Sequence, residues 1–365
     1  AVVSVAREEV KKDVLVVGGG AVGVSVARYF ALAGRQVILI DSEATPGSVN
    51  SSRNSGVIHA GLYYANSPNK EKLCIRGKHL LYDYCREKNI RFQQPGKLIV
   101  AQAGEEPLLN SIFERAVANG VPASILSGDE IKSACPDLSC VAALESPSTG
   151  IVDTQSLMQS LVTDFEAAGG LLHCRARVLG IDTSADLAQA ALGDGTRVTA
   201  DIVINSAGLN ALSLVPSGVE HGYENFFLKG SYFSYASGVP FKKLVYPLPS
   251  QGGLGIHLTL DLAGRARFGP DVSAVSTLDF AVRPEDGPKF AAAVKQYWPG
   301  CNVNKFSPDY AGIRPKLKRA GSIVPDFVFL QSHASGGSKV ISLLGMDSPG
   351  LTSCLAIAEH VFEMI

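Results

Sequence analysis

Short apolar runs alternate with helix-like stretches at the start of the chain. Residues 14–17 and 37–40 are continuous apolar runs with the length of buried parallel strands. Between them, 22–33 is rich in small apolar residues and predicts a helix that lies close on a sheet. Residues 73–88 carry apolar positions at helical spacing and predict a second, amphipathic helix. The first ninety residues therefore predict an α/β unit with a parallel sheet.

The pattern changes in the middle of the chain and then returns. Residues 226–235 and 254–268 alternate between polar and apolar positions, which is typical of an antiparallel sheet with one solvated face. Strands are also predicted at 97–101, at 201–208 within 198–208, and at 339–344, and helices at 107–119, after 155 and at 351–364. The predicted fold is a Rossmann-like α/β domain with an inserted antiparallel-sheet domain. The α/β domain takes 1–90, 147–220 and 313–365, and the inserted domain takes 91–146 and 221–312.

Length and composition narrow the class of protein. At 365 residues the chain exceeds the size of one hydrophobic core, so two domains are expected. A net charge of −1 gives no reason to expect a nucleic-acid partner. The 7 cysteines are scattered without a CxxC pair, which favours reduced thiols over a metal site. No apolar run approaches the ~20 residues of a membrane-spanning helix, although peripheral membrane contact stays open.

A glycine-rich turn after the first apolar run carries the clearest chemical signal. Gly18 permits a tight turn, Gly20 lets the backbone approach a pyrophosphate, and Gly23 lets the helix pack closely on the strand. Asp41 follows Gly23 by 41 − 23 = 18 residues, at the end of the next strand, where it can bind a ribose hydroxyl. Strand, turn, helix and acid together predict a bound dinucleotide.

Three further motifs resemble those of one enzyme family. They are 54–64 (NSGVIHAGLYY), 311–316 (AGIRPK) and 345–352 (GMDSPGLT). With the glycine turn, they resemble the L-2-hydroxyglutarate dehydrogenases of the D-amino-acid-oxidase-like superfamily, nearly from end to end. The chain departs from better-known members in a shorter link through 297–300, which resembles a compact subgroup.

The resemblance implies FAD as the cofactor, bound non-covalently, with covalent attachment through His59 as the less favoured alternative. Arg53 is the expected phosphate partner because its guanidinium can bond two oxygens. The helix that begins near Thr352 would stabilise negative charge on the reduced ring. The full set of expected cofactor-binding residues is Gly18, Gly20, Ala21, Val22, Gly23, Asp41, Ser52, Arg53, Asn54, Ser55, His59, Val178, Ala207, Gly208, Gly345, Ser348, Gly350, Leu351 and Thr352.

The substrate implied by the resemblance is a small 2-hydroxy acid. Arg314 is the expected partner of its carboxylate, because the following proline holds it in extended backbone. His59 and His257 are both candidates for the base that removes the hydroxyl proton. Lys229, Tyr232 and Tyr64 are expected to line the pocket, and Lys229 or Lys97 would bind the far end of a diacid.

The leading hypothesis is FAD-dependent oxidation of L-2-hydroxyglutarate to 2-oxoglutarate, with hydride transfer to flavin N5. A quinone or electron-transfer protein would then accept the electrons. Two alternatives stay open: an amino-acid or other hydroxy-acid oxidase of the same superfamily, and a non-catalytic dinucleotide-binding scaffold. By resemblance, the protein would be mitochondrial in a eukaryote, and otherwise cytoplasmic or peripheral to the inner membrane.

Overall fold

The computed structural model describes residues 9–249 and 255–365 and divides the chain into two compact units. The first unit contains Ala1–Ser52, Gln155–Phe226 and Pro315–Ile365. The second unit contains Arg53–Thr154 and Phe227–Arg314. Position 254, the start of one predicted strand, lies outside the described residues.

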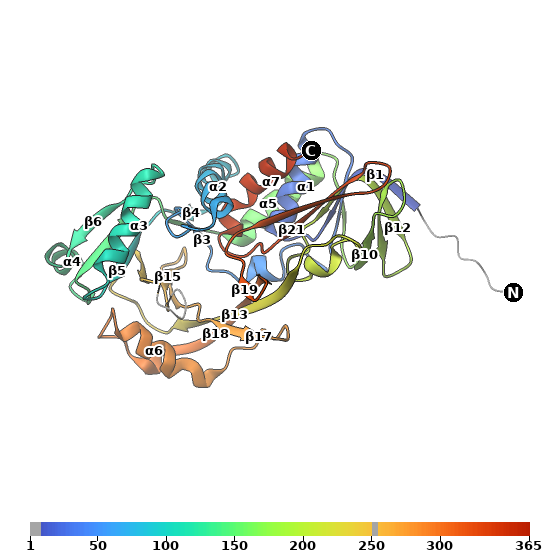
Figure 1. The fold of residues 1–365 in the computed structure, drawn as a ribbon. Coiled ribbons are helices and arrows are strands. Elements are labelled where there is room, and N and C mark those ends of the chain that lie inside the picture. Colours follow the sequence, from blue (N-terminus) through green and yellow to red (C-terminus); the bar gives the residue numbers. More distant parts are fainter. Residues whose placement is uncertain (1–8, 250–254) are drawn as a thin grey trace. The chain divides into compact units, whose positions relative to one another are not determined.

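The first unit is built on an eight-stranded, mostly parallel sheet (Figure 1). Its central strand β1 (Glu9–Val17) pairs in parallel with β2 (Val37–Ile40) on one side and β12 (Arg197–Asn205) on the other. The carboxyl half of β12 pairs in parallel with β21 (Lys339–Leu344), a strand predicted at these residues. The remaining strands are β9 (Leu171–His173), β10 (Val178–Asp182), β11 (Ala188–Leu192) and β20 (Val328–His333).

Three α-helices belong mainly to the first unit. These are α1 (Ala21–Leu32), α5 (Thr154–Ala167) and α7 (Gly350–Glu363), which confirm the predicted helices to within a few residues. Helices α1 and α7 lie side by side (Figure 1). Phe362 packs its ring against both Tyr29 and Phe30, with ring centroids 5.1 Å apart in each pair. The two ends of the chain therefore build one helical layer.

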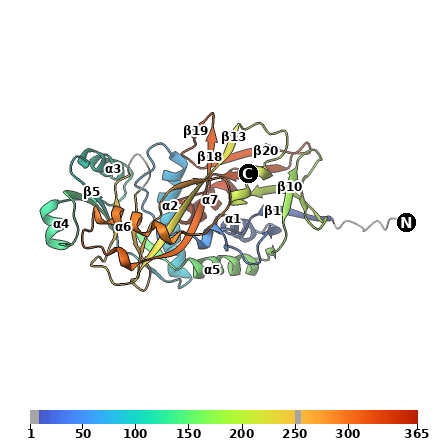
Figure 2. The same ribbon diagram turned by 90° about the horizontal axis from the view of Figure 1, so that it is seen from below.

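The second unit contains most of a ten-stranded sheet. Its strand order is β19-β18-β13-β16-β15-β14-β5-β7-β6, with β17 beside β13. Two long strands, β13 and β18, run side by side in this sheet and carry the chain from one unit to the other (Figure 2). The strands are β5 (Lys97–Ala101), β6 (Ser124–Ser127), β7 (Ala142–Ser146), β13 (Tyr223–Tyr235), β14 (Leu244–Pro247), β15 (Leu258–Leu260), β16 (Ala266–Phe268), β17 (Ser273–Val275), β18 (Phe306–Arg319) and β19 (Ser322–Ile323).

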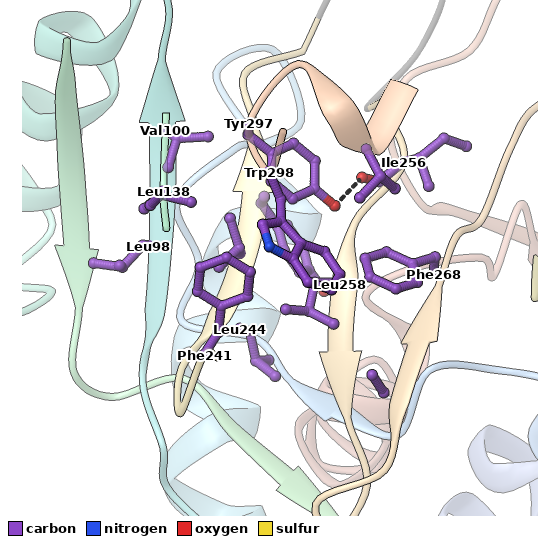
Figure 3. Packing of buried hydrophobic residues seen from close by; sticks show 14 of the residues in the cluster. Leu98, Val100, Leu138, Phe241, Leu244, Ile256, Leu258, Phe268, Tyr297 and Trp298 are labelled. Atoms are coloured by element: carbon purple, nitrogen blue, oxygen red, sulfur yellow. Dashed lines mark hydrogen bonds between the residues drawn. The ribbon is translucent and has the colours of Figure 1, made fainter. Parts of the chain in front are cut away.

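An aromatic core packs against this sheet in the second unit (Figure 3). Trp298 stacks near Phe268 and meets the edge of Phe241, and the Tyr297 hydroxyl donates to the Ile256 carbonyl at 3.0 Å. Trp298 and Tyr297 follow helix α6 (Gly287–Lys295). The short link noted in the sequence therefore follows directly on a helix and closes the core.

The two compact units begin and end at other residues than the predicted domains. The chain enters the second unit at Arg53, whereas the first predicted boundary follows residue 90. Helix α2 (Pro68–Glu87) accounts for the difference, because its Tyr82 hydroxyl donates to the Ser148 carbonyl and its Lys78 amine donates to the Ser148 hydroxyl. The second unit also holds α3 (Glu106–Ala118), α4 (Gly128–Ala134) and a small sheet of β3 (Val57–Ile58), β4 (Phe92–Gln93) and β8 (Gly150–Val152).

Candidate functional site

Loops at the carboxyl ends of four neighbouring parallel strands meet at one edge of the first unit's sheet. Asp41 follows β2, Gly18 follows β1, Ser206 follows β12 and Gly345 follows β21. Backbone hydrogen bonds tie them together: Gly18 N–H donates to the Ile40 carbonyl and Ser206 N–H to the Val17 carbonyl, both at 2.8 Å. Ligands of open α/β sheets bind at this edge.

The glycines of the first loop are there because neighbouring backbone leaves no room for a side chain. A Cβ on Gly23 would lie 1.8 Å from the Gly18 carbonyl oxygen, and one on Gly18 would lie 2.5 Å from the Ser206 carbonyl oxygen. Gly20 is different, because a Cβ there would meet only the Ser51 hydroxyl at 3.3 Å. The turn is therefore packed tightly on its inner side and open at Gly20, as a phosphate cradle requires.

Helix α1 begins at this open position with its N-terminus available to an anion. Its N-cap residue Gly20 provides no side-chain cap, and no acidic residue occupies the first turn. The Ser51 hydroxyl accepts a hydrogen bond from Ala21 N–H at 2.9 Å. The neighbouring Ser52, a predicted cofactor-binding residue, donates its hydroxyl to the carbonyls of Ser48 and Val49, and its contact with the cofactor stays a prediction. Ser51 therefore contacts the N-terminus of helix α1, a role that was not predicted from the sequence.

Asp41 is placed to organise the glycine loop. Its carboxylate accepts hydrogen bonds from the backbone amides of Gly19 and Glu43. Burial raises the pKa of Asp41 above its ordinary value, while these two amides act in the opposite direction. A carboxylate has about four lone-pair sites, so the predicted ribose contact remains compatible with this arrangement.

The last loop of the first unit connects two of the motifs. Lys316, in 311–316, forms an ion pair of 2.8 Å with the buried Asp347 in 345–352. The amide of Gly350 donates to the Asp347 carbonyl at 2.6 Å, directly where α7 begins. Helix α7 has no side-chain cap and no acidic residue in its first turn, so its N-terminus also favours an anion.

The other predicted cofactor residues of the first unit lie around the same sheet. Gly208 adopts φ +57° after β12, and a Cβ there would meet nothing within 4 Å, so its surroundings are open. Val178 begins β10, on the edge of the sheet beyond β11. Their predicted contacts with the cofactor stay predictions.

In the second unit, strand register brings polar side chains to one face of the large sheet. Lys97 on β5 is level with Leu244 on β14, so Lys97 and Tyr246 share a face. Tyr246 stacks on His257, with ring centroids 3.6 Å apart, just before β15. Thr259 on β15 is paired with Arg267 on β16, and both lie on this face as well.

The same face continues across β13 and β18. Arg267 pairs in register with Ser234, so Tyr232 and Gly230 share its face by alternation. Tyr232 packs against Tyr310, with ring centroids 4.8 Å apart. Arg314, four residues beyond Tyr310, has its Nη2 3.3 Å from where a Gly230 Cβ would lie. We call these residues the polar sheet face: Lys97, Tyr246, His257, Thr259, Arg267, Tyr232, Tyr310 and Arg314.

Arg314 has the properties expected of a carboxylate-binding residue. It is half-buried, and within residues 9–249 and 255–365 no carboxylate forms an ion pair with it. Its neighbours are the Tyr232 phenol, whose pKa is raised by burial, and the side-chain-free Gly230. A partly desolvated guanidinium without an ion-pair partner is suited to bind a small carboxylate.

Lys229 does not share this face. It is three residues from Tyr232, and strand alternation places residues an odd number apart on opposite sides of the sheet. Its amine donates to the Ala281 carbonyl at 2.5 Å and lies 3.5 Å from the Asp279 carboxylate. The Lys229 amine thus holds 279–281, and its predicted place in the substrate pocket stays a prediction.

The loop before α2 brings several predicted residues into the second unit. Arg53 lies over the Phe280 ring at 4.8 Å, and its carbonyl oxygen would be 2.4 Å from a Cβ on Gly312. The Asn54 carbonyl accepts from the Tyr310 hydroxyl, and Ser55 hydrogen-bonds Tyr232. This close approach explains Gly312 in the 311–316 motif, a glycine whose role was not identified from sequence.

His59 and Tyr64 lie near helix α2. The Cys74 thiol donates to the His59 carbonyl at 3.6 Å and is hydrogen-bonded with the Tyr64 side chain. Burial, and then the positive charge of Lys97, lower the pKa of His59 to about 3. His59 is therefore neutral near pH 7, the state in which an imidazole can accept a proton.

The fold and the first unit's loops define a dinucleotide-dependent α/β protein with a second, mainly antiparallel substrate-side sheet. Comparison with known proteins identifies the family, because the family described as FAD dependent oxidoreductase matches residues 13–364. The chain belongs to this family, and it is an FAD-dependent oxidoreductase. The tight glycine turn, the helix N-terminus without an acidic residue in its first turn, and the open Gly20 fit the diphosphate of that cofactor.

Three relatives of known sequence share one name. The chain is 37% identical to the mitochondrial L-2-hydroxyglutarate dehydrogenase of Arabidopsis thaliana, over 98% of this chain and 84% of that protein. It is 29% identical to the mitochondrial enzyme of that name from Homo sapiens, over 97% of this chain and 88% of that protein. The Escherichia coli protein named L-2-hydroxyglutarate dehydrogenase is 26% identical, over 97% and 93%.

Solved structures confirm the fold. L-alpha-glycerophosphate oxidase from Mycoplasma pneumoniae superposes with a TM-score of 0.85 at 23% identity, covering 97% of this chain and 94% of that one. Glycine oxidase from Geobacillus kaustophilus gives a TM-score of 0.80 at 18% identity, with coverage of 97% and 94%. Among the described residues, no helix is both long and apolar enough to cross a membrane.

Proposed function

We propose that this protein oxidises L-2-hydroxyglutarate to 2-oxoglutarate, using its FAD as the two-electron acceptor. The observation that carries the proposal is Arg314, a half-buried guanidinium on the polar sheet face with no ion-pair partner in the described part of the chain. The names of the relatives, at 26% to 37% identity over nearly the whole chain, support the choice of acid.

The chain's own residues account for three requirements of this reaction. Arg314 would bind the carboxylate next to the reacting carbon and so orient the substrate. The neutral His59 imidazole would take the hydroxyl proton at a ring nitrogen, with His257 as the other candidate base. Tyr232 and Tyr64 would contribute hydroxyl groups around the substrate. When bound, FAD supplies the site that accepts a hydride from the substrate carbon.

The charges of the polar sheet face favour an acid over an amine as substrate. Asp309 is engaged by Arg267 at 2.6 Å, so its carboxylate is already neutralised. Arg314 is a cationic side chain without an ion pair among the described residues. An amine substrate would need a carboxylate or carbonyl cage in its place.

The first experiment is an anaerobic titration of the holoenzyme with the separate L and D enantiomers of 2-hydroxyglutarate. Loss of the oxidised flavin absorption band with the L enantiomer alone supports the substrate and its stereochemistry. If neither enantiomer changes the spectrum, the proposed substrate is wrong, and a panel of hydroxy acids and amino acids would identify the class.

Arg314→Met tests the carboxylate contact directly. Loss of one or two hydrogen bonds to a charged group, at about 1.5–3 kcal/mol each, predicts an increase in KM of at least roughly 10-fold. Arg319→Met is a matched control, because Arg319 lies on the same strand but is exposed against Tyr223. If R314M and R319M have equal KM values, Arg314 does not bind the substrate.

A further inference from the structure

Lys97 is a buried cation that no acidic group neutralises. Its side chain on β5 is 1% exposed, although lysine is almost never fully buried without a partner. Over residues 9–249 and 255–365, no hydrogen bond or ion pair reaches its amine. Instead the amine lies 4.7 Å from the centroid of the Tyr63 ring and 4.7 Å from that of Tyr246. Contacts of this kind offset only part of the cost of burying an ammonium group.

The groups that face Lys97 are neutral or basic. From the loop before α2 come His59 and Tyr63, and from β14 comes Tyr246. Burial raises the pKa of both phenols, so they carry no charge near neutral pH.

Strand β7 presents its one carboxylate, Glu145, to the other face of the sheet, level with Leu98 and paired with Lys243. The group of helix α2 that acts on Lys97 is the Cys74 thiol. Burial raises the pKa of the Cys74 thiol on α2 to about 12. Lys78, on the same helix, is a second buried cation that donates to the Ser148 hydroxyl at 3.2 Å. On β7, Ser146 is level with Lys97 and its hydroxyl is hydrogen-bonded to that of Thr149.

Lys97 and His59 therefore compete for one proton. Loss of hydration lowers the pKa of Lys97 to about 7. Burial and the nearby charge of Lys97 lower that of His59 to about 3. Two positive charges in one desolvated cluster repel each other strongly, so the pair holds at most one proton near neutral pH, and that proton is on Lys97.

We propose that Lys97 is a positioning residue that acts through His59: its amine must be neutral before the His59 imidazole can take up the substrate's hydroxyl proton. With Lys97 protonated, proton transfer to His59 would create two adjacent cations. With Lys97 neutral, the hydroxyl proton moves to a ring nitrogen of His59, and the proton that Lys97 had carried has gone to solvent. The identity of the substrate rests on the proposed function. The electrostatic coupling between Lys97 and His59 rests only on the buried residues around them.

The kinetic test is the pH dependence of kcat/KM in the holoenzyme. In the wild type, kcat/KM should fall about tenfold per pH unit below the Lys97 pKa of about 7. Lys97→Met removes the competing charge, so the fall in kcat/KM near pH 7 should disappear, and the remaining acidic limb should lie lower, at the pKa of His59 itself. Lys97→Arg keeps a permanent charge and should depress kcat/KM at every pH. Lys97→Gln is a second neutral variant in case the methionine variant does not fold.

Lys78→Met is the matched control, because it removes a neighbouring buried lysine whose charge does not act on His59. It should retain the acidic limb of the wild type. If Lys97 were only structural, K97M would lower kcat/KM by one factor at all pH values and leave the limb in place. That result would overturn the proposal.

A second readout does not depend on turnover. Histidine labelled with carbon-13 at the ring would report the titration of His59 by NMR, assigned with His59→Gln. In K97M the His59 pKa should rise towards the ordinary value, whereas in K78M it should match the wild type. Equal His59 titration in K97M and wild type would overturn the proposal even if the enzyme is active. A shift in K97M in an enzyme that oxidises no 2-hydroxy acid would support the coupling and refute the proposed function.

Discussion

Replacement of Gly23 by alanine should separate cofactor binding from the rest of the fold. The new methyl group would lie 1.8 Å from the Gly18 carbonyl oxygen, roughly half of the 3.4 Å at which ordinary contact begins, and 2.5 Å from the Ser206 hydroxyl. The Ser206 hydroxyl can rotate, but the Gly18 oxygen is backbone and cannot. The start of helix α1 must therefore move away from the turn.

The size of the effect follows from this displacement. Overpacking of a tight contact costs about 1–3 kcal/mol of folding free energy. Moving the helix N-terminus also withdraws backbone amides from the cofactor phosphates. Loss of a single hydrogen bond to such a charged group, about 1.5–3 kcal/mol, would raise the dissociation constant for FAD roughly 10- to 150-fold.

The assay is titration of apoprotein with FAD, followed by quenching of flavin fluorescence. Gly180→Ala is the matched control, because Gly180 lies in β10 of the same unit and a Cβ there meets nothing within 4 Å. The control should bind FAD as the wild type does. An unchanged dissociation constant in Gly23→Ala would refute the account of the turn as a cofactor cradle.

Three further predictions use the charged residues. Lys316→Met breaks the ion pair with the buried Asp347 and should lower FAD affinity by loosening the loop before α7, as fluorescence titration would reveal; equal affinity would show that the loop is held by other contacts. Lys229→Met should leave KM for the substrate unchanged and lower unfolding free energy by about 1 kcal/mol, because its amine holds 279–281. The pKa of Lys97 is lowered on folding, so the unfolded chain binds more protons between about pH 7 and the ordinary lysine range. Stability should therefore rise with pH in that window, by up to about 1.4 kcal/mol per unit, in chemical denaturation of the wild type but not of Lys97→Met; parallel pH curves would contradict this.

Elements with a strong local pattern could be predicted from the sequence. Strands β5 and β21 match the predicted ranges, because an apolar run between turn residues specifies a buried strand locally. Alternation along β13 is equally local. It separates Lys229 from Tyr232 by an odd number of positions, which is enough to assign the two side chains to opposite faces of the sheet.

Features that depend on distant contacts could not be predicted in this way. Helix α2 follows the first two strands in sequence, yet it bonds Ser148, which lies 66 residues beyond Tyr82. Nothing local to Lys97 reveals that its amine is buried between two aromatic rings from other segments. The glycine turn was recognised because its function depends on spacing within one segment.

The order of strands in the first unit has a consequence for how the chain folds during synthesis. Strand β1 lies between β2 and β12, and β12 pairs in turn with β21, which ends at Leu344. The cofactor-binding sheet therefore cannot be completed until Leu344 has been made, and helix α1 then still awaits α7. The apolar strand of the glycine motif must remain protected from aggregation throughout elongation, whereas every segment of the second unit has already emerged.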